Sequence, residues 1–385
     1  MAGPLQVLIQ DSGSGLLVAG LPSSLRAAHR AASDLKPAKI VFCGNSKDFA
    51  SRYARQLKSL GPIPLPCANG EAAGKYFDSE APLLVLGPDG FPREGSVSEF
   101  LTAARKTGKP ARWLQSGLAV AAYYPRAGDI LGASETAAAL AQRSLKEPGE
   151  FAGVQTNGSW LAAGQDDSIR QAEDVLCASL AKDTDGYIAR IDRRLSIALS
   201  MLMLKTPITP NDITTASLAL GLLGAWWLAS GSQLWQFIGA LVLWFCCILD
   251  GCDGEVARLK LLCSPSGAAY DLWADHLAHL ATFVAIPFGV HRMFPQANFL
   301  VPGIFLVTGF LGCGFSVWWL VLRLPDEKRG PYSLLIERVA SRDYIYLIVI
   351  LTALGRMDWF LWTASVGSHV FYLALWWISR SPKSA

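Results

Sequence analysis

Four aspartates lie within one of the most apolar parts of this 385-residue sequence. Asp250 and Asp253 are three residues apart, and Asp271 and Asp275 are four residues apart. Residues at these spacings share one face of an α-helix, so each pair would point in one direction on a helical segment. Two antiparallel helices joined through residues 263–266 would bring all four carboxylates to one place. Four converging carboxylates require cations, because unpaired charges are costly in an apolar environment.

Carboxylate oxygens suit hard cations such as Mg²⁺, which proteins commonly share with substrate phosphates. Two such ions would clamp a diphosphate and stabilise the charge that develops as a phosphorus–oxygen bond breaks. Gly254 and Ala257 follow on the same helical face and leave room for a ligand close to the backbone. Arg258, one turn beyond Gly254, is suited to bidentate binding of a phosphate. The cluster therefore predicts a site for a metal-bound diphosphate.

These residues resemble the signature of the CDP-alcohol phosphotransferase family. The family pattern is Asp-x-x-Asp-Gly-x-x-Ala-Arg, eight residues, Gly, three residues, Asp, three residues, Asp. Every position is matched, by Asp250, Asp253, Gly254, Ala257, Arg258, Gly267, Asp271 and Asp275. The resemblance implies transfer of a phospho-alcohol group from a CDP-alcohol to a second alcohol, with release of CMP. It also implies two divalent ions, Mg²⁺ or Mn²⁺, and a homodimer.

The resemblance assigns roles by position in the pattern. Asp250, Asp253 and Asp271 would be metal ligands, and Asp275 would be both a ligand and the general base that takes the proton of the acceptor hydroxyl. The residues expected to bind the CDP-alcohol are Asn211, Thr214, Gly254, Ala257, Arg258, Ser264 and Gly267. Arg338 and Arg342 are candidates for binding the acceptor, with anchoring at the positive side of the membrane as the alternative.

Two histidines, His276 and His279, directly follow Asp275. A di-iron bundle would use Glu-x-x-His pairs from two helices, and this chain has only one Asp-His-Leu-Ala-His stretch. We therefore expect both histidines to pack near the site rather than to bind metal.

Long apolar runs are concentrated after Lys205, whereas the first half has a mixed composition. This division predicts a soluble domain followed by an all-α membrane domain. Six spans are expected at about residues 211–229, 234–262, 267–290, 299–322, 333–354 and 358–378. Basic residues then fall mostly on one side, which predicts that both termini are cytosolic. The expected location is the cytoplasmic membrane of a prokaryote.

The first half alternates short β-type runs with helical ones, which predicts an αβα sandwich on a largely parallel sheet. Candidate strands are residues 7–9, 16–19, 39–42, 83–86 and 118–123, and Ser96 with Glu99 suggests a capping box. The expected division is an α/β domain at residues 1–165, a linker with an amphipathic helix at 166–205, and the membrane domain at 206–385. Arg190, Arg193 and Arg194 on that helix suit contact with anionic headgroups.

The whole chain resembles a branch of the family in which a nucleotidyltransferase-like domain precedes the phosphotransferase. Fusions of inositol-phosphate cytidylyltransferase with di-inositol-phosphate-phosphate synthase are the example. The active form of that first domain has a glycine-rich loop followed by arginine, and a downstream lysine. The corresponding stretch LLVAGLPSSLR lacks these groups. The domain is therefore expected to be catalytically silent, with a role in docking a partner, in regulation or in steadying the dimer.

Other classes of function are less well supported. A net charge of +3 without a basic, aromatic-interleaved patch gives no reason to expect nucleic acid as a partner. The eight cysteines show no CxxC pair, which favours reduced, structural thiols. A cation- or proton-coupled transporter is the main alternative, since intramembrane carboxylates also line such pathways. The acidic motif is not repeated, and all four of its aspartates are present, so an enzyme is favoured over a transporter or an inactive scaffold. The identities of the two alcohols stay open, and we expect at least one to be a lipid.

Overall fold

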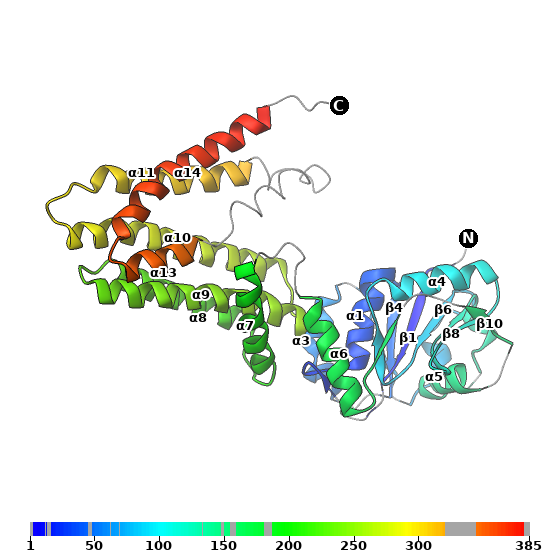
Figure 1. Ribbon diagram of the computed structural model, residues 1–385. Helices are drawn as coiled ribbons and strands as arrows, with labels where there is room; N and C mark the ends of the chain where they lie inside the picture. The colour runs from blue at the N-terminus through cyan, green and yellow to red at the C-terminus, as the bar shows by residue number, and fades with distance from the viewer. Residues whose placement is uncertain are drawn as a thin grey trace. The chain divides into compact units, whose positions relative to one another are not determined.

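The computed structural model describes residues 3–11, 13, 17–44, 48–61, 63–68, 70–132, 134–147, 150–154, 159–180, 187–319 and 344–380. The chain forms two compact units (Figure 1). The first comprises Met1–Leu180 and Arg258–Leu262, and the second comprises Ala181–Ala257 and Cys263–Ala385. Among the described residues, all strands lie in the first unit, and the second is helical.

A seven-stranded sheet forms the centre of the first unit, in the order β10-β8-β9-β6-β1-β4-β5. The strands are β1 (Gln6–Gln10), β4 (Lys39–Cys43), β5 (Cys67–Ala68), β6 (Leu83–Leu86), β8 (Ala111–Gln115), β9 (Leu118–Tyr124) and β10 (Ala152–Val154). Only β9 is antiparallel to its neighbours β6 and β8. The reason is a two-residue hairpin at Ser116 and Gly117, which have φ values of 52° and 80° as a primed turn requires.

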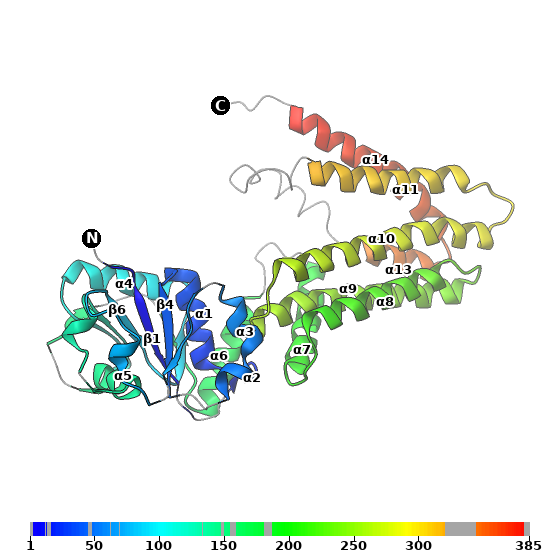
Figure 2. The same cartoon turned by 180° about the vertical axis from the view of Figure 1, so that it is seen from behind.

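Helices cover both faces of this sheet (Figure 2). The helices α1 (Ser23–Leu35), α4 (Ser96–Thr107) and α6 (Asp166–Ala178) contribute to one apolar cluster, and α5 (Ala137–Lys146) contributes to another. Side chains alternate along β1, with Val7 and Ile9 in the first cluster and Leu8 in the second. The predicted αβα sandwich is therefore confirmed.

Short elements complete the first unit. They are β2 (Leu17–Val18), β3 (Leu21–Pro22), β7 (Gly90–Pro92), β11 (Trp160–Ala162), α2 (Phe49–Arg52) and α3 (Ala54–Ser59). The expected capping box at Ser96 is wrong. Gly95 is the N-cap of α4, and the Ser96 hydroxyl accepts a hydrogen bond from the backbone N–H of Ser159 instead. The Ser96 side chain, which was expected to cap the helix, is therefore hydrogen-bonded to a residue distant in the sequence.

The second unit contains seven described helices. They are α7 (Tyr187–Leu204), α8 (Pro210–Leu228), α9 (Gln233–Leu259), α10 (Pro265–Met293), α11 (Leu300–Val317), α13 (Tyr344–Ala353) and α14 (Met357–Arg380). The helix α8 packs along α10, and α11 packs along α14. Thr209 caps α8 through a capping box with Asp212, and Pro210 occupies its first turn. An apolar core drawn from α8, α9, α10, α11, α13 and α14 holds the unit together.

Small residues allow helices to cross closely in this unit. A Cβ built on Gly239 would lie 2.7 Å from the carbonyl oxygen of Gly224, so the backbones of α8 and α9 approach too closely for side chains. By length and hydropathy, α9 and α11 each suffice to cross a membrane, and α13 is apolar but shorter in its described part. Described helices lie in all six predicted ranges, although residues 333–343 of the fifth range fall outside the described residues.

Candidate active site

The acidic motif lies where α9 ends and α10 begins. Asp250 and Asp253 are near the C-terminal end of α9, and Asp271 and Asp275 are in the first turns of α10. Ser264 is the N-cap of α10, and its hydroxyl accepts a hydrogen bond from the backbone N–H of Gly267. Pro265 follows at the first helical position, where its missing N–H costs nothing. The sequence Ser-Pro-Ser-Gly thus starts a new helix within a few residues of the previous one, which returns the chain toward Asp250.

Three of the four motif carboxylates meet. Asp250, Asp253 and Asp271 each offer one oxygen, and these oxygens lie within 4.8 Å of one another. Asp253 is 5% exposed, so its charge is largely removed from solvent. Like charges at this separation repel strongly in a poorly solvated site. The arrangement suits a divalent cation, which would satisfy all three groups at once.

Asp271 supports this interpretation independently. Its Oδ1 atom is buried and has no hydrogen-bond partner among the described residues. A buried acceptor without a partner is costly, and native structures rarely retain one without an ion or water to satisfy it. An oxygen of this kind beside two further carboxylates has the chemistry of a metal ligand, so the residues present fit a divalent ion.

Thr214 of α8 holds one member of the cluster in place. Its hydroxyl donates a hydrogen bond of 2.5 Å to Oδ2 of Asp253. The side chain of Thr214 is buried, at 4% exposure. Thr214 was expected to contact the CDP-alcohol; in the structure its hydroxyl contacts the carboxylate of Asp253, a candidate metal ligand, and the carbonyl of Pro210 on its own helix.

Asp275 stands apart from the three grouped carboxylates. It lies one turn further along α10, where its Oδ1 is 3.5 Å from Nε2 of His279. The His279 ring contacts that of Tyr344, with 5.8 Å between ring centres. Asp250, Asp275, His279 and Tyr344 line a common small cavity. Asp275 thus faces a space next to the acidic cluster, where a proton acceptor could meet a substrate hydroxyl.

Three of the other expected substrate residues lie around the start of α8 and α10. A Cβ added to Gly267 would stand 2.9 Å from Ser264 Oγ and 3.5 Å from Asn211 Oδ1, so these three residues are neighbours. Gly254 and Ala257 are half-buried on α9, and Arg258 is exposed in its last turn. Arg338 and Arg342, the candidates for binding the acceptor, lie outside the described residues.

Glu255 is a functional candidate that the sequence reasoning missed. It is fully buried, and it contacts Arg193, Ser196 and Ser200 of α7. One signal in the sequence could have found it: Glu255 is a carboxylate at a position of the motif where the family pattern allows any residue. Arg193 was expected to face lipid headgroups, and the structure directs it to this buried glutamate instead.

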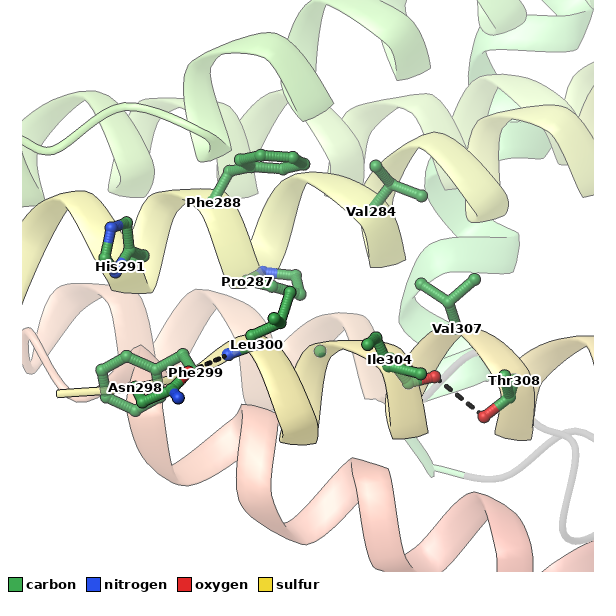
Figure 3. A pocket seen from close by; sticks show the side chains of 11 residues that line it. Val284, Pro287, Phe288, His291, Asn298, Phe299, Leu300, Ile304, Val307 and Thr308 are labelled. Carbon is green, nitrogen blue, oxygen red and sulfur yellow. Dashed lines mark hydrogen bonds between the residues drawn. The ribbon is translucent and has the colours of Figure 1, made fainter.

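An apolar cavity of about 440 Å³ lies elsewhere, between α10 and α11 (Figure 3). Its lining includes Val284, Pro287 and Phe288 of α10 and Ile304 and Val307 of α11. Pro287 follows Asp271 by 16 residues, or about 24 Å along a helix, so the cavity is separate from the acidic cluster. It contains no acidic side chain among its lining residues and has none of the chemistry of the motif.

Comparison with known families gives a match over the helical unit. Residues 207–377 match the family model described as CDP-alcohol phosphatidyltransferase. This range contains all eight residues of the motif, so the family resemblance is confirmed.

Curated relatives carry related descriptions. A bifunctional IPC transferase and DIPP synthase of Rubrobacter xylanophilus is 34% identical over 139 residues, which cover 34% of this chain and 31% of that protein. The protein of the same description from Archaeoglobus fulgidus is 27% identical over 208 residues, covering 53% of this chain and 40% of that protein. The inner membrane protein YnjF of Escherichia coli is 33% identical over 112 residues, which cover 29% of this chain and 50% of that protein. The matches thus span half or less of these relatives.

One solved structure with a related description is phosphatidylinositol phosphate synthase of Mycobacterium tuberculosis with CDP-DAG bound. It is 18% identical, with a TM-score of 0.35, and the comparison covers 50% of this chain and all of that one.

Proposed function

We propose that this chain transfers a phospho-alcohol group from a CDP-alcohol to a second alcohol and releases CMP, because residues 207–377 match the family model described as CDP-alcohol phosphatidyltransferase. The observation that carries the proposal is the meeting of Asp250, Asp253 and Asp271 within the matched domain. The family match also sets aside the transporter alternative.

Asp250, Asp253 and Asp271 would hold the divalent ions, Mg²⁺ or Mn²⁺, with Asp275 next to them as a further ligand. Bound ions would supply positive charge against the diphosphate of the donor. Support comes from the buried, unpartnered Oδ1 of Asp271 and from the hydrogen bond by which Thr214 fixes Asp253. Asn211, Ser264 and Gly267, grouped at the start of α8 and α10, would contact the cytidine diphosphate together with Gly254, Ala257 and Arg258.

Asp275 would act as the general base. It accepts the proton of the acceptor hydroxyl, whose oxygen then forms a bond to the β-phosphorus of the donor. The bond from that phosphorus to the CMP oxygen breaks, and the electron pair leaves with CMP. The position of Asp275 beside His279, on a cavity shared with Asp250, supports this role because the base must reach a hydroxyl next to the bound diphosphate.

The substrates belong to polar-lipid synthesis. The donor would be CDP-diacylglycerol or a CDP-linked headgroup such as CDP-inositol. The acceptor would be an inositol or glycerol phosphate, or a lipid hydroxyl, and Arg338 and Arg342 would bind it. Support comes from the two helices α9 and α11, which are long and apolar enough to place the site in a membrane. The relatives named IPC transferase and DIPP synthase make CDP-inositol the first donor to test.

The deciding experiment is a CMP-release assay on the purified protein. CDP-inositol and CDP-diacylglycerol would be offered in turn with inositol phosphate, glycerol phosphate and lipid acceptors, in Mg²⁺, Mn²⁺ or EDTA. We expect metal-dependent CMP release with one donor–acceptor pair, and a product detected by mass spectrometry. Absence of CMP release with every pair, from protein that retains its helical content, would contradict the proposal.

The membrane topology is part of the same proposal. Six helices, α8, α9, α10, α11, α13 and α14, would cross a prokaryotic cytoplasmic membrane, with both termini in the cytosol and two copies forming a homodimer. Cysteine substitution at Lys205 and Arg292, followed by labelling of intact cells with an impermeant maleimide, tests this arrangement. Labelling is expected at position 292 and not at position 205.

The α/β unit is proposed to be catalytically silent. Its expected glycine-rich loop lacks the arginine and lysine of an active nucleotidyltransferase. Incubation with CTP and inositol phosphate is expected to release no pyrophosphate. Release at a rate similar to that of CMP formation would assign this unit a reaction of its own.

A further inference from the structure

Glu255 points away from the metal cluster. On a helix with 3.6 residues per turn, Glu255 lies about 200° around α9 from Asp253 and about 140° from Asp250. Its side chain has no exposed surface. A carboxylate buried on the far side of the motif helix cannot serve the cluster directly, so its partners indicate what it does.

Among the residues that the structure describes, all partners of the Glu255 carboxylate come from α7. Ser196 donates to Oε1 at 2.6 Å, Ser200 donates to Oε2 at 2.8 Å, and Arg193 donates to Oε1 at 3.2 Å. These three residues follow one another at intervals of three and four, so they occupy one face of α7. Cys252, on the same side of α9, extends the contact through its thiol, which donates to the backbone carbonyl of Ser196.

This geometry fixes the register between the two helices. Burying a carboxylate is tolerated only when donors replace its lost hydration. Sliding α7 by one residue would rotate its side chains by about 100° and withdraw the donors together. The buried charge therefore permits one arrangement of α7 on α9, whereas an apolar contact would permit several.

A second polar contact with α7 lies about three turns from Glu255 along α9. Asp192 of α7 accepts hydrogen bonds from Trp244 Nε1 of α9, at 3.3 Å, and from the Tyr346 hydroxyl of α13. Tyr346 is two residues from Tyr344, which lines the small cavity with Asp250 and Asp275. Thus α7 holds α9 at two levels and contacts the helix that borders the cavity.

The opposite face of α7 is apolar and basic. Ile191, Leu195 and Leu202 are 58%, 44% and 64% exposed, and Arg190 and Arg194 are exposed beside them. Apolar residues flanked by arginines are typical of a helix that lies in the membrane interface. One face of α7 therefore suits contact with lipid headgroups, while the other face packs against α9.

We propose that Glu255 is a positioning residue. Its hydrogen bonds to α7, which we call the α7 lock, fix α9 on the side away from the cluster, and they thereby set the positions of Asp250 and Asp253 for binding a divalent ion. The metal-binding part of this inference rests on the proposed function. The α7 lock rests only on the contacts of Glu255. The lipid-facing helix α7 thereby supports the site mechanically without touching the substrate.

The test uses the full-length protein in detergent and two readouts that need no turnover. The variants are Glu255→Leu and the double variant Ser196→Ala/Ser200→Ala, which keeps the glutamate and removes two donors. The matched controls are Ser196→Thr/Ser200→Thr, which retains both hydroxyls, and Arg194→Met on the exposed face. Hydrogen exchange of peptides from α7 and α9 reports the lock, and electron paramagnetic resonance titration with Mn²⁺ reports the metal site.

We expect both disrupting variants to exchange at least tenfold faster along α7 and to bind Mn²⁺ about tenfold more weakly, with both controls close to the wild type. Faster exchange with unchanged Mn²⁺ affinity would overturn the positioning role and leave α7 a structural support only. Unchanged exchange would overturn the lock itself. Failure of the wild type to bind Mn²⁺ would instead contradict the proposed function, and hydrogen exchange would still decide whether Glu255 holds α7.

Discussion

The hydroxyl of Thr214 on α8 donates a hydrogen bond to the carboxylate of Asp253 on α9, which ties the first helix of the matched domain to the candidate metal ligands. Both side chains are at most 5% exposed. A buried hydrogen bond to a charged group orients that group and is costly to lose. The relationship makes Thr214 a neighbour of the candidate metal site, and its role there can be tested.

Thr214→Val removes this donor while nearly preserving volume. A hydrogen bond to a charged group contributes about 1.5–3 kcal/mol, so the half-saturating Mg²⁺ concentration should rise roughly tenfold or more. Thr214→Ser, which keeps a hydroxyl, should remain within a few-fold of the wild type. The measurement is CMP release as a function of Mg²⁺ concentration. Equal Mg²⁺ dependence in the valine and serine variants would remove Thr214 from the metal site.

Asp275→Asn tests the general base. The amide keeps the shape of the side chain and cannot accept the proton of the acceptor hydroxyl, so CMP release should fall by about 10²–10⁴-fold, as expected for loss of acid–base catalysis. The control is His276→Gln, because His276 is exposed and its described side-chain contact is with the carbonyl of Leu272 on its own helix. Asp250→Asn and Asp253→Asn should chiefly weaken metal-dependent donor binding. Undiminished CMP release from folded Asp275→Asn would exclude it as the base.

Gly267→Ala tests the group formed with Ser264 and Asn211. The added Cβ would stand 2.9 Å from Ser264 Oγ, which is closer than real contacts allow. The N-cap of α10 must then shift, and loss of such a cap costs about 1 kcal/mol. We expect a higher KM for the CDP-alcohol. Gly314→Ala in α11 is the matched control, because a Cβ there meets nothing within 4 Å. A similar KM in both variants would argue against a role of Gly267 in donor binding.

His29 predicts an acid-sensitive α/β unit. Burial, with a further contribution from the charges of Arg26 and Arg30, lowers the pKa of His29 from 6.5 to about 4. The folded state therefore disfavours protonation. Its contribution to stability is fully present above pH 6.5 and is lost as the pH falls from 6.5 toward 4, by about 2 kcal/mol at pH 5.

The measurement for His29 is resistance of the α/β unit to proteolysis in increasing urea, at pH 7.5 and pH 5. His29→Gln does not titrate, so its difference in stability between the two pH values should be smaller by that amount. The glutamine side chain can also retain a hydrogen bond to the carbonyl of Gln56, which His29 contacts at 3.3 Å. If the stability of the α/β unit depended equally on pH in the variant and in the wild type, His29 would not be the source of the acid sensitivity.

Much of this protein could be predicted from its sequence. Helical spacing placed Asp250 and Asp253 on one face, and the expected connection at residues 263–266 returned the chain toward them, so the acidic cluster followed from local rules. Alternating short strands and helices likewise indicated the αβα sandwich. Hairpin geometry at Ser116 and Gly117 then decided that β9 runs antiparallel, which hydrophobic patterns alone do not specify.

The sequence by itself determined which residues could bind metal, because residue types and spacings along one helix suffice for that. The family pattern already gave Asp275 a role of its own, but only the tertiary structure placed it apart from the other three carboxylates and joined Thr214 to Asp253. It also turned Arg193 from its expected place at the headgroups to the buried Glu255. The physical reason is that partners on different helices depend on how each helix is rotated against its neighbours, and that rotation is set by packing and buried charge throughout the unit.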